Sequence, residues 1–96
     1  MSWTREKYRD WEKAGDPNTD SETLYELSFA KSWKIRERVA ENPNTPIHAI
    51  SQLRYDDYDD VIRAVHGNPK FRKLLDLRGD RDYEVLLMAS KYLKIY

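Results

Sequence analysis

Four aspartates within five residues form the densest group of metal-binding side chains in this sequence. The stretch DDYDD, residues 56–60, offers the carboxylate oxygens that hard divalent cations prefer. It lacks the alternating D-x-D-x-D-G layout with a later glutamate that is typical of a calcium loop. It also precedes an apolar pattern typical of a helix, and negative charge stabilises a helix N-terminus. We therefore predict a helix start here and no metal site.

The histidines and serines show no arrangement suited to catalysis or metal binding. His48 and His66 fall on different predicted helices, and neither has a second ligand at helical spacing. No serine stands in the strand-to-helix turn of a hydrolase nucleophile. A chain of 96 residues also has little room for an enclosed active site. We predict a protein that is not an enzyme and needs no cofactor.

A basic run near the C-terminus has the charge to bind phosphate. Repeat scaffolds can bind nucleic acid through such a patch. However, 17 acidic residues balance the 17 basic ones, and the sequence has no phosphate-binding loop such as GxxxxGK[ST]. We therefore interpret the basic run as a solvated face of the protein. A nucleic-acid-associated protein that uses this run is the alternative hypothesis. The residues of this run are Lys70, Arg72, Lys73, Arg78 and Arg81.

The composition narrows the class of protein further. The absence of cysteine excludes disulfides, zinc–thiolate sites and thiol nucleophiles. The N-terminal stretch MSWTREKYRDWEK lacks the apolar core of a signal peptide. No run approaches the roughly 20 apolar residues needed to span a bilayer. We expect one domain, residues 1–96, located in the cytoplasm and without membrane contact.

The elements that would position these side chains recur with a fixed period along the chain. Asn42-Pro43 returns as Asn68-Pro69, and apolar residues return at the same offset. A third, slightly shorter copy keeps the apolar spacing. The offset between the two Asn-Pro pairs is 26 residues. Such a period is typical of a solenoid, in which short units bury their apolar faces only by stacking. The aligned pairs include Pro17 and Pro43, Leu24 and Ile50, Leu27 and Leu53, Ile35 and Val61, and Val39 and Val65.

Each unit is interpreted as two short helices, A and B. Thr19 and Thr45 are the expected N-caps of the first two A helices. Apolar residues four apart mark the B helices: Ile35 and Val39, Val61 and Val65, Val85 and Ala89. The proline after each asparagine ends helix B, because the residue before proline avoids the helical region. We predict an all-α solenoid of about three helical pairs: a capping helix at 1–15, repeats at 16–41 and 42–67, and a third repeat with the C-terminal helix at 68–96.

Residues 35–46, IRERVAENPNTP, resemble the variant leucine-rich repeat, a HEAT- and armadillo-like α-helical family. The second unit departs from the pattern, since its arginine comes one place later at Arg63 and His66 replaces an alanine. The resemblance covers about residues 16–90. It implies a right-handed stack of short helices that binds other proteins. The iron–sulfur module of some members does not transfer, because this chain has no cysteine.

The C-terminal helix carries apolar residues around most of its circumference. The equivalent B-helix positions change from Glu37 and Arg38 through Arg63 and Ala64 to Leu87 and Met88. A helix that is apolar all round is normally buried, and an exposed apolar patch marks an interface. The sequence leaves two alternatives for this apolar surface: burial within the chain, or contact with another molecule, such as a second copy in a homodimer.

The sequence thus favours a small regulator or adaptor, bacterial or from a phage, that binds a partner protein. The ladder of helix B side chains and the apolar C-terminal helix would form the contact surface. Loop tyrosines would add anchors, because Tyr, Trp and Arg dominate interface hot spots. The predicted partner-binding residues are Trp33, Lys34, Glu37, Arg38, Tyr55, Tyr58, Arg63, Tyr83, Leu87, Met88 and Tyr92.

Overall fold

A computed structural model describes residues 3–71 of the chain. This range contains helices and no strand, which confirms the prediction of an all-α protein. The third repeat beyond residue 71 and the C-terminal helix lie outside the described residues. The helices are α1 (Arg5–Gly15), α2 (Ser21–Leu27), α3 (Trp33–Glu41), α4 (Ile47–Leu53) and α5 (Asp59–Gly67).

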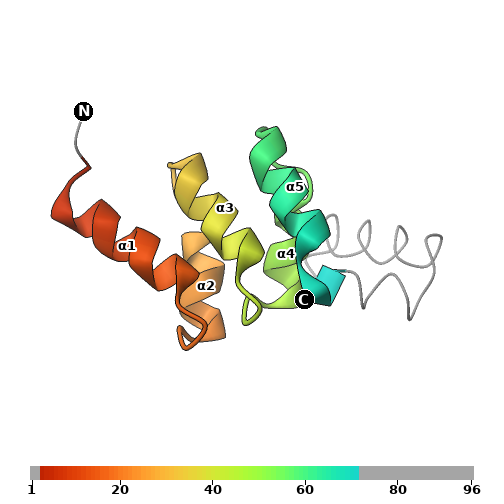
Figure 1. Ribbon diagram of the computed structural model, residues 1–96, viewed down its shortest axis with the longest axis horizontal. Helices are drawn as coiled ribbons and strands as arrows, with labels where there is room; N and C mark the ends of the chain where they lie inside the picture. Colours follow the sequence, from red (N-terminus) through yellow and green to blue (C-terminus); the bar gives the residue numbers. More distant parts are fainter. Residues whose placement is uncertain (1–2, 72–96) are drawn as a thin grey trace.

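These helices form two layers. Helix α3 packs against α1 on one side and α5 on the other, while α2 packs against α4 in the second layer. Figure 1 shows α1, α3 and α5 side by side with a similar tilt. Even α1, at 11 residues, is too short to be stable alone in water. Contact between the helices must therefore stabilise them.

The core lies between the two layers. In α3 and α5 the predicted B-helix stripes are at most 2% exposed, which confirms their burial. Ile50 and Leu53 of α4 belong to the same buried cluster, as does Ala14 of α1. Each large apolar side chain contributes about 1.5–3 kcal/mol when it is fully buried. The periodic apolar residues therefore supply the main stabilisation of the stack.

The helices α1, α3 and α5 end in the same way. Each is followed by a residue in an extended conformation: Asp16, Asn42 and Asn68 have ψ angles of 119°, 124° and 130°. A proline follows each of them, and the residue before proline disfavours the helical region. The Asn-Pro pairs therefore predicted the ends of α3 and α5 correctly.

The asparagines also connect each unit to the one before it. Nδ2 of Asn42 donates hydrogen bonds to the carbonyl oxygens of Ala14 (2.8 Å) and Asp16 (2.9 Å). Nδ2 of Asn68 donates in the same way to Ala40 (2.8 Å) and Asn42 (3.0 Å). Both asparagines are at most 2% exposed. The same pair of bonds thus recurs from one unit to the next, and it fixes the spacing of successive turns.

The predicted N-caps of the A helices are wrong. The cap of α2 is Asp20, whose carboxylate accepts from the N–H of Thr23 at 2.8 Å, and the cap of α4 is Pro46. The hydroxyls of Thr19 and Thr45 instead donate 2.6 Å hydrogen bonds to carbonyls six residues earlier. Each threonine thereby ties the turn to the end of the preceding helix.

Candidate functional site

Three adjoining cavities follow the face formed by α1, α3 and α5. Their volumes are about 310, 300 and 370 Å³. Trp11 lines both the first and the second, and Glu37 and Glu41 line both the second and the third. We call this continuous depression the α1–α3–α5 groove. Its lining residues are Trp3, Tyr8, Trp11, Gly15, Lys34, Glu37, Arg38, Glu41, Asn42, Pro43, Arg63, Ala64 and Gly67.

Aromatic rings line the α1 end of the groove. The rings of Trp3 and Tyr8 meet edge-on with centroids 5.4 Å apart, and those of Trp3 and Trp11 with centroids 6.5 Å apart. Tyr8 is 53% exposed. Half-exposed aromatic side chains give large contact areas at low entropic cost, which suits a binding surface. The amphipathic pattern of this helix predicts only a capping role, and it does not predict these residues as part of the site.

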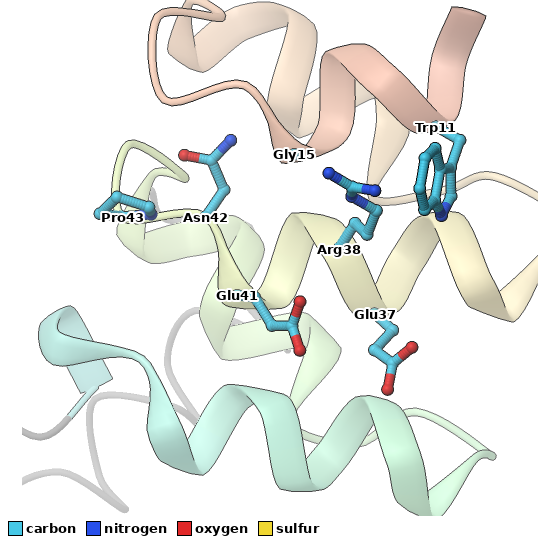
Figure 2. A pocket seen from close by; sticks show the side chains of 7 residues that line it. All are labelled: Trp11, Gly15, Glu37, Arg38, Glu41, Asn42 and Pro43. Carbon is cyan, nitrogen blue, oxygen red and sulfur yellow. The ribbon is translucent and has the colours of Figure 1, made fainter. Parts of the chain in front are cut away.

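Arg38 lines the middle of the groove. Its guanidinium lies 3.6 Å from the centroid of the Trp11 ring, and Figure 2 shows it between Trp11 and Gly15. A Cβ atom on Gly15 would overlap Nη2 of Arg38. The missing side chain at this position therefore lets the guanidinium approach α1 closely.

This close approach predicts different effects of alanine at two helix-terminal glycines. Gly67→Ala is expected to raise the free energy of unfolding by about 0.5 kcal/mol, because alanine favours the helix and a Cβ there has nothing within 4 Å. Gly15→Ala is not expected to raise the free energy of unfolding. The added Cβ would displace the guanidinium of Arg38 from the Trp11 ring, and this lost contact would offset the gain in helix propensity. Urea unfolding of both variants measures the difference. Equal stabilisation would contradict the packing of Arg38 on Gly15.

Two carboxylates line the α3–α5 part of the groove. Figure 2 shows the side chains of Glu37 and Glu41 directed toward α5. Partial burial, together with the negative charges of Glu41 and Asp60, raises the pKa of Glu37 above its ordinary value, and Lys34 opposes this. Arg63 contacts Asp60 at 3.5 Å, and both side chains are largely exposed. This part of the groove therefore favours a positively charged group.

The structure brings together part of the predicted partner-binding set. Lys34, Glu37, Arg38 and Arg63 line the groove. Tyr83, Leu87, Met88 and Tyr92 lie outside the described residues.

Beside the groove, Trp33 stacks on Tyr58, with centroids 5.4 Å apart and planes 14° apart. The ammonium of Lys34 lies 5.8 Å from the Trp33 ring and links this aromatic pair to the groove. Tyr55 is 47% exposed, on the turn between α4 and α5, and does not line the groove. The aromatic pair therefore extends the candidate surface at the start of α3 and α5, whereas Tyr55 does not.

The aspartates of DDYDD have separate structural roles. Asp59 and Asp60 lie in the first turn of α5, as predicted. Asp56 instead forms an ion pair with Arg36 of α3, with Oδ2 2.7 Å from Nε. No group of three or more potential metal ligands occurs within residues 3–71.

Only the first residue of the basic run, Lys70, lies in the described range. Its ammonium donates to the carbonyl of Thr45 at 2.8 Å. Lys70 is thereby engaged in a contact with the preceding unit, at the place where Asn44 contacts Thr19 one unit earlier. The other residues of the run lie outside the described range.

Comparison of the chain with protein-family models, with curated proteins and with solved structures finds no match. The resemblance to the variant leucine-rich repeat therefore stays a prediction from the residues. Among the helices of residues 3–71, none has the length and apolar character needed to cross a membrane.

Proposed function

We propose that this chain is a non-enzymatic module that binds a partner protein through the α1–α3–α5 groove. The main support for the proposal is the groove itself, which has partly exposed aromatic rings at one end and carboxylates at the other. Protein interfaces are enriched in Tyr, Trp and Arg, and all three occur here. A surface of this kind offers apolar contact area together with charge selectivity.

We further propose that the helical pairs continue as a right-handed solenoid of about three repeats, in the manner of the variant leucine-rich repeat. The hydrogen bonds of Asn42 and Asn68, which recur at the same offset, support this arrangement. Stacked units place equivalent side chains in rows and create extended binding surfaces. The cytoplasmic location and the C-terminal helix as a second contact surface belong to the same proposal.

Capture of the partner by the tagged full chain from a lysate of the native host, with cross-linking and mass spectrometry, tests the proposal. The groove variant Tyr8→Ala/Ala64→Trp removes an exposed ring and fills the third cavity without changing charge. We expect it to reduce recovery of the partner at least about tenfold, the effect of losing 1.4 kcal/mol of binding free energy. Circular dichroism checks that the variant keeps its helices.

A matched control makes the same kinds of change outside the groove. Phe29→Ala/Ser21→Trp removes another exposed ring and adds a tryptophan on α2. We expect this variant to retain the partner. Loss of the partner with the control alone, equal recovery with both variants, or no specific partner for the wild-type chain would refute the groove as the binding surface.

A further inference from the structure

The groove follows two contacts between helices, α1 with α3 and α3 with α5, which we call the first and the second seam. The two seams occupy equivalent positions in successive repeats. The hydrogen bonds of Asn42 to the preceding unit recur at Asn68, so the offset between these asparagines relates the α1–α3 seam to the α3–α5 seam. With this offset of 26 residues, Trp11 corresponds to Glu37, Gly15 to Glu41, and Arg38 to Ala64. The two seams therefore share a backbone arrangement and differ in the side chains that line it.

The first seam shows how this fold holds a guanidinium group. Arg38 extends from α3 across the seam, with its guanidinium stacked on Trp11 and seated over Gly15. At the second seam Ala64 stands in the place of Arg38. The cavity beside Ala64 is about 370 Å³, compared with about 300 Å³ beside Arg38 at the first seam. We call the cavity beside Ala64 the α3–α5 notch.

The walls of the notch carry negative charge. Glu37 and Glu41 take the places of Trp11 and Gly15, and both line the notch. Arg63 also lines it, but its side chain is 77% exposed and its guanidinium contacts Asp60. Partial burial, and then the negative charges of Glu41 and Asp60, raise the pKa of Glu37, so a positive charge placed beside this carboxylate would be favourable.

We infer that the α3–α5 notch receives an arginine side chain from a basic segment of the partner protein. This inference rests on the proposed function and names the chemistry of the partner. A planar guanidinium has five N–H donors and can bond two carboxylates at once, which the compact ammonium of lysine does less well. Its stem would pack on Ala64 and Gly67, where space is open.

A pair of short peptides tests the inference on the full chain. The probes are acetylated, amidated pentapeptides with a central arginine or a central citrulline, flanked by two glycines on each side. Citrulline keeps the shape of arginine but has no charge. In 1H–15N NMR titrations at millimolar concentrations, we expect the arginine peptide to shift the amide signals of residues 37, 41, 64 and 67. The citrulline peptide is expected to bind about tenfold more weakly.

Two double variants separate the notch from general electrostatic attraction. Glu37→Gln/Glu41→Gln keeps the shape of the notch and is expected to weaken the arginine peptide by about tenfold. Glu22→Gln/Glu26→Gln makes the same change of charge on exposed residues of α2 and is expected to leave binding unchanged. Ala64→Arg places an arginine of the chain itself in the notch, as Arg38 is in the first seam, and should block the peptide.

Three outcomes would overturn the inference: no saturable shifts, shifts that map to other residues, or equal effects of the two glutamine variants. Any of these results combined with groove-dependent capture of a partner would reject the arginine and leave the proposed function intact. Capture that does not depend on the groove would reject the proposed function itself. The peptide titration therefore tests the arginine, and the capture experiment tests the groove, separately from each other.

Discussion

Replacing Asn42 with alanine is expected to lower the free energy of unfolding by about 3 kcal/mol, since each unsatisfied buried polar group costs about 1–3 kcal/mol. The amide of Asn42 donates to the carbonyls of Ala14 and Asp16, and its Oδ1 accepts from the N–H of Asn44. Asn42 is 2% exposed and its bond to Ala14 is buried, so water cannot replace that bond without a change in structure. Urea unfolding followed by circular dichroism measures the change.

Asp16→Ala provides the matched control, because Asp16 takes the equivalent position one unit earlier. Asp16 is exposed, and its carboxylate accepts from the N–H of Asn18 at 2.9 Å without bridging two units. We expect this substitution to cost less than about 1 kcal/mol. Equal losses at residues 16 and 42 would show that the bridge between units contributes nothing.

An isosteric variant, Asn42→Asp, separates the hydrogen bonds from the packing. Its carboxylate would face two carbonyl oxygens, and only the protonated form could donate to one of them. The pKa of this group should therefore be higher in the folded than in the unfolded state. The deficit relative to wild type should then be smallest at acidic pH, below the pKa of the unfolded chain, and grow as pH rises through the folded-state pKa.

The sequence predicted the burial of the B-helix stripes because periodicity directly records which side faces the core. Val39 and Val65 illustrate this, since both are 0% exposed. The roles of Thr19 and Asn42 could not be found in the same way. A threonine before a helix has the same local pattern whether its hydroxyl accepts from the helix or donates to an earlier carbonyl. The partner of Asn42 at Ala14 lies 28 residues away, and only packing of the units reveals it.

The groove was predicted in part for a related reason. Lys34, Glu37 and Arg38 were found because they lie on the outer side of a helix whose inner side was identified. The sequence does not predict Trp11 as a site residue, because the recurring Asn-Pro and apolar pattern begins near residue 16 and the N-terminal helix has only the amphipathic pattern of a cap. Extending the repeat offset upstream places Trp11 in the same row as Glu37 and Arg63. That alignment was the available signal.

Asp56→Ala is expected to lower the free energy of unfolding by about 3 kcal/mol, within the range found when one partner of a buried ion pair is removed. The carboxylate of Asp56 accepts from Nε (2.7 Å) and Nη2 (3.2 Å) of Arg36. The exposed fractions of the two side chains are 8% and 15%, so little water screens the pair. The same guanidinium donates from Nη1 to the carbonyls of Ala30 (2.7 Å) and Lys31 (3.0 Å). Urea unfolding again provides the measurement.

A double-mutant cycle separates the ion pair from the other bonds of Arg36. Arg36→Met removes the guanidinium that donates to Asp56 and to the carbonyl oxygens of Ala30 and Lys31. It should therefore lower the free energy of unfolding by at least as much as Asp56→Ala. The double variant removes both charges and should cost about 2 kcal/mol less than the sum of the single variants. Additive losses would show that the two side chains do not stabilise each other.

A neighbouring aspartate of the same DDYDD stretch provides the control. Asp60 contacts Arg63 at 3.5 Å, but the two side chains are 48% and 77% exposed. Exposed pairs of this kind contribute about 0–1 kcal/mol, and we expect Asp60→Ala to change stability by less than about 0.5 kcal/mol. A loss at Asp60 as large as that at Asp56 would mean that burial does not distinguish the aspartates. The contrast is expected because Asp56, unlike Asp60, is held in a largely buried contact between successive units.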